Sequence, residues 1–549
     1  MKQASFVIAV IIFVSITGRC ANFTVSNNSD AGAGSLRQAI IGANLAGGGT
    51  ITFSGVSGTI ALESSLPLLV TNTIILGPGV NELTVSAARS PALTNELASM
   101  LTNALGSTAY IRGLKLTAKG AIVRNFGRLT LNECAVSDGS LGGIDNAGSM
   151  YLQNCVVANN RGNPSRKGAG ILNSGDLSMD DCTVSGNHTS SSDGGGIYNT
   201  GTMDLSRCAI LTNTTVFGDG CGIYNSGTAR LNVCTVARNS FGGAALGGGI
   251  LNSSGTMILR HCSITNNTSI EGGGIWNRGW LEAFGCLFYA NRATYSQGPQ
   301  PGGAIYNHPA GTVLIENTTI SRNSSLDLGG GVMNHGMLVA LNCTIASNLV
   351  ITSYGSGQAG GGIWNAGTVH SKNSIFAGNS AAAYGPDFYG TLFSDGFNLI
   401  QNTNDCAIVG VTTGNLTGAD PLLGGLQDNG GPTWTHALLS GSPAIENGSN
   451  YGAPSTDQRG VARPQGLNVD IGAFEFQPDQ PMLVAITAQS PTNVWMQSWS
   501  RPGASHTLEA STNLTQWLRV ADFNADPNGL WEFNDAELKD RPTRFYRVK

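Results

Sequence analysis

Five charged side chains on neighbouring repeats of this 549-residue chain have the types that proton-transfer chemistry requires. Clustered carboxylates bind a hard cation such as Ca²⁺, and a nearby basic group takes a proton in an elimination. Two carboxylates at a defined separation hydrolyse a glycosidic bond instead. The interpretation we favour is a ladder of surface ion pairs, which is common and contributes little energy. The five residues are Asp180, Asp181, Asp204, Arg207 and Arg230.

A second group of side chains is suited to binding. One position of the repeat described below is aromatic in several copies, and alternation along a strand directs that position outward. Exposed aromatic rings stack on sugar rings or meet a partner protein. The alternative, which we favour, is that variable loops such as residues 189–193 cover the rings and make a second hydrophobic layer. The candidate ligand-binding residues are Tyr198, Tyr224, Trp276, Tyr306 and Trp364.

Two histidines offer weaker chemistry. His308 and His335 each follow a repeat asparagine and should stack on adjacent coils, below Arg278. Zinc usually takes three or four protein ligands, so we interpret the two histidines as exposed turn residues. We therefore expect no metal site and no resident cofactor. Ca²⁺ would enter only with the elimination chemistry.

An internal repeat must position all of these side chains. A motif of the type GGAIYN, here residues 302–307, recurs about every 27 residues. A cysteine lies nine residues after most of the motif asparagines. The asparagines are Asn125, Asn146, Asn173, Asn199, Asn225, Asn252, Asn277, Asn307, Asn334 and Asn365. The cysteines are Cys134, Cys155, Cys182, Cys208, Cys234, Cys262, Cys286 and Cys343, with Thr318 and Ser374 in two copies.

The repeat predicts short strands. Apolar residues alternate with polar ones between clusters of Gly and Asn, as in Met203, Leu205, Cys208 and Ile210. One repeat has too few apolar residues to bury a face alone, so the repeats must stack. Strands that recur once per turn pair in parallel, about 4.8 Å apart. The expected fold is all-β, a right-handed parallel β-helix.

In such a solenoid each repeat position becomes a column along the rod. A column of asparagines passes side-chain hydrogen bonds from coil to coil. Stacked cysteines have a Cα spacing that permits disulfides. Their parallel side-chain directions, and the replacements by Thr318 and Ser374, favour a reduced packing ladder instead. Cys221 and Cys406 have no evident partner.

Composition excludes some classes of partner. Charged residues make up 11% of the chain, and the net charge is -5 with no run of Lys or Arg. That pattern gives no electrostatic footprint for nucleic acid. After the first residues, no hydrophobic stretch reaches membrane-spanning length, so we expect no transmembrane segment in the mature chain.

The first twenty residues have the pattern of a secretory signal. Lys2 precedes the apolar stretch 6–16, which is followed by small or polar residues. Cys20 invites a lipoprotein interpretation, but the bulky Arg19 departs from the small residue that a lipidation signal has there. The sequence therefore predicts a signal peptide over 1–20 and export to the medium or the cell surface of a bacterium.

Two stretches resemble known families. GGAIYN, with FYAN at 288–291 and FAGN at 376–379, resembles the repeats of chlamydial polymorphic outer membrane proteins and related bacterial β-helix adhesins. Residues 396–476, which include GGPTWTHALLSGSPAIENG and DIGAFEF, resemble the choice-of-anchor Q region of bacterial surface proteins. This second resemblance implies surface display and brings no catalytic residues. Its landmarks are His436, Ser442, Pro443, Ala444, Ile445, Asp457, Gln458, Arg459, Gly460, Arg463, Pro464, Asp470, Gly472, Phe474 and Glu475.

Segments at both ends should close the solenoid. Ser35 and Gln38 form a capping-box pattern for a short helix whose Leu36, Ala39 and Ile40 would cover the first coil. After Phe476, QPDQP is a linker pattern. The tail that follows resembles the small β-sandwich-like module at the end of many exported bacterial proteins.

The expected organisation follows the chain. It comprises a signal peptide at 1–20, an N-terminal cap and first coils at 21–105, β-helix repeats at 106–395, a choice-of-anchor Q-like closing region at 396–476, and a small module at 477–549. The leading function is a surface-displayed, non-enzymatic adhesin or spacer that binds a polysaccharide or a host or neighbouring cell surface. The β-helix resemblance also includes pectate lyases and polygalacturonases, so the alternative is a polysaccharide lyase or glycoside hydrolase.

Overall fold

The structure of the chain is a computed structural model. It describes residues 21–87, 99–162, 167–294, 301–351, 359–477, 482–490, 493–500, 503–526, 530–535 and 544–548. The predicted signal peptide at 1–20 lies outside the described residues.

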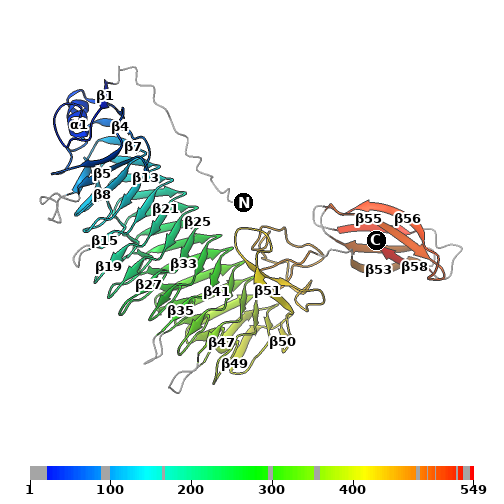
Figure 1. Cartoon of the computed structure of the whole chain (residues 1–549). Coiled ribbons are helices and arrows are strands. Elements are labelled where there is room, and N and C mark those ends of the chain that lie inside the picture. The colour runs from blue at the N-terminus through cyan, green and yellow to red at the C-terminus, as the bar shows by residue number, and fades with distance from the viewer. Residues whose placement is uncertain are drawn as a thin grey trace.

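Each turn of the chain contributes short strands that pair in parallel with those of the next turn. One coil contains β20 (Ile197–Asn199), β21 (Thr202–Ser206), β22 (Ala209–Leu211) and β23 (Thr214–Thr215), and the next contains β24 (Ile223–Asn225), β25 (Thr228–Asn232), β26 (Thr235–Ala237) and β27 (Ser240–Phe241). Ile197 lies beside Ile223, and Asn199 lies beside Asn225. The coils stack into a rod (Figure 1), so the predicted parallel β-helix is confirmed.

Sheets of 27, 15 and 8 strands line the rod. Their inward residues make one continuous apolar core that runs from Val25 to Ile400. The strands that end on the repeat asparagine belong to the largest sheet and carry the site described below. Besides β20 and β24 they are β9 (Ala121–Asn125), β12 (Ile144–Asn146), β16 (Ile171–Asn173), β28 (Ile250–Asn252), β32 (Ile275–Asn277), β36 (Ile305–Asn307), β40 (Val332–Asn334) and β44 (Ile363–Asn365).

The repeat asparagines form a continuous hydrogen-bonded ladder. Asn199 Nδ2 donates to Asn225 Oδ1 at 2.8 Å, and its own Oδ1 accepts from Asn173 at 2.7 Å. A second ladder is formed by the asparagines that lie five residues after the repeat cysteine. In this ladder the Asn213 side chain donates to that of Asn239 at 3.0 Å. All of these side chains are buried, so the ladders satisfy amide groups that would otherwise be unpaired in the core.

The cysteine column also carries hydrogen bonds. The Sγ atom of Cys234 accepts the backbone N–H of Cys208 at 3.4 Å and donates to the carbonyl of Asn232 at 3.3 Å. Where the column changes residue type, Thr318 Oγ1 accepts from Cys286 N at 3.3 Å in the same way. The column is therefore a buried row of small donors and acceptors, and the cysteines of the described residues are free thiols.

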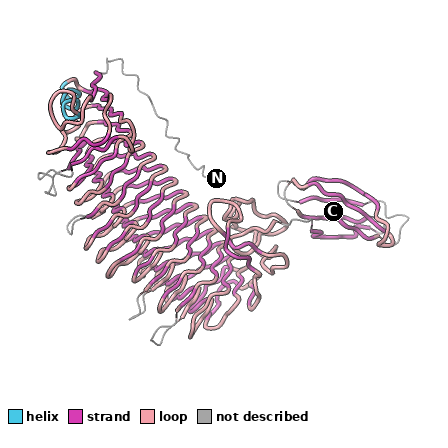
Figure 2. Tube along the Cα trace, viewed as in Figure 1, coloured by secondary structure: helices cyan, strands magenta, loops and turns pink. Residues whose placement is uncertain are grey.

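Helix α1 (Leu36–Leu45) closes the N-terminal end, where Figure 2 shows it over the first strands. Ser35 Oγ accepts from Gln38 N, which is the first half of the predicted capping box. The reciprocal half does not form, because Ser35 N donates to the carbonyl of Gly32 instead. Leu36, Ala39 and Ile40 are buried against the first coil, as predicted.

Residues 388–476 finish the rod and then fold back along it. β47 (Phe388–Asp395), β48 (Leu399–Ile400), β49 (Cys406–Val411) and β50 (Leu416–Thr417) extend the sheets. The following chain, with the hairpin β51 (Leu423–Gln427) and β52 (Thr435–Leu438), returns along the flank (Figure 1). Leu438, Ala444, Ile471 and Phe474 pack there on Ile375 of β46 (Ile375–Ala377). We call residues 417–476 the closing segment.

The C-terminal strands form two antiparallel sheets. One contains β53 (Met482–Ser490), β54 (Asn493–Trp499) and β57 (Leu530–Asp535), and the other contains β55 (Ser505–Ser511), β56 (Leu518–Asn524) and β58 (Phe545–Val548). Met496, Leu508 and Trp531 are buried in one cluster that joins the two sheets. Two sheets packed through an apolar interior match the β-sandwich-like expectation for this part of the chain.

Candidate functional site

A cleft of about 410 Å³ opens on the face of the rod made by the strands that end on the repeat asparagine. Strands β32 and β36 present Trp276 and Tyr306 to it, because the residue between an inward isoleucine and an inward asparagine must point outward. Two of the predicted aromatic candidates and both histidines therefore meet in one place. The lining residues are Leu246, Glu271, Trp276, Tyr306, His308, Pro309 and His335.

The rings of the cleft form an interlocked row. Trp276 and Tyr306 stack with centroids 5.7 Å apart and planes 14° apart. The His308 ring lies 5.5 Å from Trp276, and the His335 ring lies 5.8 Å from Tyr306 and 5.2 Å from Trp364. His335 thus lies between two aromatic rings and His308 lies against one. Both histidines are half-buried and are not the exposed turn residues that we expected.

The aromatic column is partly covered. Tyr198 and Tyr306 are buried, whereas Tyr224, Trp276 and Trp364 are half-buried. Tyr306 packs with Leu328, Met333 and Ala359, which form a small apolar cluster outside the sheet. The rings thus belong to a small apolar layer on the outer side of the sheet, and the cleft is where this layer leaves room for a ligand. The covering of the rings by loops such as residues 189–193 stays a prediction.

Glu271 is the acid of the cleft. Its Oε2 accepts a hydrogen bond of 3.2 Å from Trp276 Nε1, and the residue is 9% exposed. Burial raises the pKa of this carboxyl to about 7, and the negative charge of Asp219 contributes to the rise. Glu271 therefore exchanges its proton near neutrality and can accept or donate a hydrogen bond there.

A second polar patch lies on earlier coils of the same face. Lys167 Nζ donates to Tyr198 Oη at 2.9 Å and lies 3.1 Å from the carboxylate of Asp193. The Tyr198 and Tyr224 rings stack with centroids 4.5 Å apart, and Lys167 lies over the Tyr198 ring. The charges and ring faces at this patch are engaged with one another, so it offers less to a ligand than the cleft does.

The five predicted catalytic candidates form exposed ion pairs. Arg207 contacts Asp180 at 2.6 Å and Asp181 at 2.8 Å, while Arg230 lies 3.6 Å from Asp204. Asp181 and Arg207 sit on successive coils at a corner where φ is 51° in both, which directs their side chains to solvent side by side. The arrangement is the surface ladder that we favoured, and the cleft lining does not include these residues.

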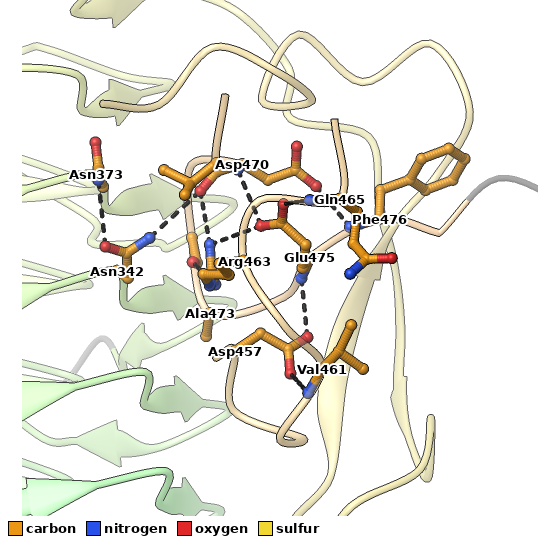
Figure 3. Close-up of polar contacts among 12 residues, drawn as sticks. Asn342, Asn373, Asp457, Val461, Arg463, Gln465, Asp470, Ala473, Glu475 and Phe476 are labelled. Carbon is orange, nitrogen blue, oxygen red and sulfur yellow. Dashed lines mark hydrogen bonds and ion pairs between the residues drawn. The ribbon is translucent and has the colours of Figure 1, made fainter. Parts of the chain in front are cut away.

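The closing segment holds a dense group of buried charges (Figure 3). Arg463 and Glu475 form a fully buried ion pair of 3.0 Å, and Arg463 also donates to the carbonyl of Asp470 at 2.9 Å. Asp457 Oδ2 accepts from Glu475 N at 3.0 Å, and its Oδ1 accepts from Val461 N at 3.0 Å. These acids are occupied by backbone and arginine donors, which is the pattern of a structural network.

Further landmarks of the closing segment bind the rod itself. Gln458 accepts from Thr319 Oγ1 at 2.6 Å and donates to the carbonyl of Cys286 at 3.2 Å. His436 Nε2 lies 2.9 Å from Ser321 Oγ. The residues that carried the choice-of-anchor Q resemblance thus fasten this segment to β38 (Thr319–Ser321) and its neighbours.

Other kinds of site are not apparent in the described residues. In that part of the chain, no three His, Cys, Asp or Glu side chains are grouped as a metal site would require. No helix there has the length and apolar character to cross a membrane.

The sequence patterns did not predict Glu271 as a site residue. It occupies the position before the glycines of the repeat, which varies between coils: Lys167, Asp193, Asp219, Leu246, Glu271, Pro301, Leu328 and Ala359. This position lies beside the aromatic column, because the intervening glycines bring the chain around a tight corner where φ is 59° at Gly272. Comparing the position before the glycines across successive repeats would have shown an acid next to Trp276.

Comparison with known proteins supports the fold. A family model described as right handed beta helix region matches residues 105–268. Together with the parallel sheets, this match defines the chain as a right-handed parallel β-helix protein. No curated protein matches the sequence.

Several solved structures match this chain at low identity. Pectate lyase Pel9A is 12% identical, with 83% of this chain and 96% of that chain covered and a TM-score of 0.32. The A-module of mannuronan C-5 epimerase AlgE4 from Azotobacter vinelandii is 13% identical, with 71% and 97% covered and a TM-score of 0.32. Tailspike protein 3 of bacteriophage CBA120 is 13% identical, with 80% and 63% covered and a TM-score of 0.36.

Proposed function

We propose that this protein is an exported, surface-displayed β-helix that binds a glycan in the cleft around Trp276 without turning it over. The observation that carries the proposal is the cleft itself, where aromatic rings adjoin the polar groups of Glu271, His308 and His335. Sugar-binding sites combine these two features, since apolar faces of the sugar pack on rings while hydroxyl groups bond to fixed polar side chains.

Export and display rest on sequence patterns. The signal pattern of 1–20 and the choice-of-anchor Q resemblance of 396–476 both support a protein of the bacterial envelope. Fractionation of the native host tests this part, because the proposal requires the mature chain in the envelope or the medium. Detection of the uncleaved chain in the cytoplasm would contradict it.

Binding is tested on a glycan array with matched tryptophan variants. Trp276→Ala should weaken binding by at least about tenfold, because a buried aromatic anchor contributes most of the energy of such a site. Trp280→Ala is the control, since Trp280 lies on the same coil, is 43% exposed and does not line the cleft. His335→Ala provides a second variant at the surface of the cleft. Equal loss of binding in Trp276→Ala and Trp280→Ala would contradict the proposal.

Turnover is the second candidate function, because Glu271 carries a proton near neutrality inside the cleft. A lyase would release unsaturated oligosaccharides from an acidic polysaccharide with Ca²⁺, and a hydrolase would release saturated ones. Product release that is lost in Glu271→Gln would establish catalysis in the cleft. Loss in Asp181→Ala would place it at the ion-pair ladder instead.

A further inference from the structure

The residues that follow the repeat asparagines form a row beside the aromatic column, and two of them, His308 and His335, line the cleft. Each member donates its backbone N–H to the asparagine carbonyl one coil earlier, as Arg278 does to Asn252, His308 to Asn277 and His335 to Asn307. On the four coils before Arg278 the row consists of Ser174, Thr200, Ser226 and Ser253. Its character changes from small hydroxyl groups to nitrogen-bearing side chains at the coils that form the cleft.

Two of the nitrogen-bearing side chains, those of Arg278 and His308, are available to an anion. Arg278 is exposed, and no ion pair joins it to a carboxylate in the part of the chain that the structure describes. His308 Nδ1 accepts the backbone N–H of Ala310 at 3.1 Å, so the hydrogen of its neutral ring is on Nε2. His308 therefore offers a donor beside the guanidinium of Arg278 whether or not its ring is charged.

Glu271 and His308 both contact Trp276, Glu271 through the indole N–H and His308 through its ring. The titratable groups around Glu271 are Asp219, Tyr306, His308 and His335, with Arg278 one step further away. Burial lowers the pKa of His308 and of His335, and the positive charge of Arg278 lowers that of His308 further. Acidification consequently removes a negative charge at Glu271 first and adds positive charge at the histidines afterwards.

We propose that the cleft binds a glycan with an anionic substituent, a carboxylate or a sulfate ester, which docks on Arg278 and His308 while the sugar ring packs against Trp276. This inference rests on the proposed glycan-binding function. Arg278 supplies a charge-assisted hydrogen bond, which is stronger than a neutral one. A charged Glu271 repels the anion, so affinity rises as pH falls from 8 to 5.

The test compares paired saccharides on the full chain at pH 5 and pH 8, at constant ionic strength. The probes are an oligogalacturonate with its carboxyl-reduced neutral counterpart, and a sulfated galactan oligosaccharide with its desulfated counterpart. One anionic member should bind about tenfold more tightly than its neutral counterpart at pH 5, the effect expected of one charge-assisted bond. The pair that shows the preference identifies the substituent.

Three variants separate the contributions. Arg278→Gln should abolish the preference and leave binding of the neutral counterpart unchanged, while Arg128→Gln, an exposed arginine on an earlier coil, should keep the preference. Glu271→Gln should bind the anionic member more tightly than the parent protein does at pH 8, and the rise in its affinity between pH 8 and pH 5 should be smaller than that of the parent protein. Equal affinity for both members of each pair at both pH values would overturn this inference and leave glycan binding intact. Absence of binding to every array glycan would overturn both proposals.

Discussion

Trp276 Nε1 and Glu271 Oε2 are joined by a hydrogen bond of 3.2 Å, which ties the aromatic row to the acid of the cleft. The two residues are five positions apart on one coil, and the three glycines between them turn the chain so that their side chains meet. A polar partner for the indole fixes the ring, and the ring in turn screens the carboxyl from water. The orientation of the Trp276 ring and the proton affinity of Glu271 therefore depend on each other.

Glu271→Gln should stabilise the protein at pH 8 and leave it unchanged at pH 4. The folded-state pKa of about 7 lies above the unfolded value of 4.5, so ionisation in the fold is unfavourable. The stability that the neutral acid contributes is complete below pH 4.5 and is lost as pH rises toward and through 7. Glutamine keeps an acceptor for Trp276 and never ionises. Thermal unfolding of both proteins across this pH range measures the effect.

A difference in Tm that is the same at pH 4 and pH 8 would show that Glu271 does not change its proton affinity on folding. Glu282→Gln is the control, since Glu282 is a more exposed acid on the same coil and is paired with Arg260 at 3.3 Å. That variant should not acquire a higher Tm at pH 8.

Asn199→Ala should destabilise the rod strongly. The Asn199 amide donates to Asn225, Gly201 and Thr228 and accepts from Asn173, so its removal leaves buried groups on two coils unpaired. The expected cost is about 2 to 4 kcal/mol, measured by urea denaturation. Asn232→Ala is the control, because Asn232 is exposed on the neighbouring coil. Comparable costs for both variants would contradict a role for the ladder.

Gln458→Leu should loosen the closing segment without unfolding the rod. Its side chain bridges Thr319, Cys286 and Thr433, and leucine leaves those groups unsatisfied under the segment. Hydrogen exchange should accelerate over residues 417–476 and stay slow in coils far from it, because solenoid repeats interact mainly with their neighbours. Gln427→Leu, an exposed glutamine of β51, should exchange like the parent protein. Acceleration throughout the rod in Gln458→Leu would contradict local fastening.

The periodic part of the sequence was sufficient to predict the rod. Equivalent positions of successive repeats stack on one another, so the spacing of the repeat predicted both the pairing of Asn199 with Asn225 and the burial of Cys208. Glu271 was not predicted, because its position varies from coil to coil and carries no periodic signal. The return of Gln458 to Thr319 spans 139 residues, and no local pattern specifies a contact of that length. The left-handed φ of 53° at Val233 could not be predicted from the residue type either, because the stacking of the coils and not the preference of valine imposes it.

The cysteine column provides a final test, because packing and hydrogen bonding predict opposite orders of stability for its variants. Cys234 Sγ accepts from Cys208 N, and its single hydrogen faces the carbonyls of Asn232 at 3.3 Å and Leu205 at 3.5 Å. Serine can keep these bonds, as Ser374 does when its hydroxyl accepts from Cys343 N at 3.1 Å. Alanine removes them and leaves a buried N–H unpaired, at a cost of about 1 to 3 kcal/mol. Cys234→Ser should therefore be more stable than Cys234→Ala in urea denaturation. If the column only filled space, the apolar alanine would be the better replacement and the order would reverse.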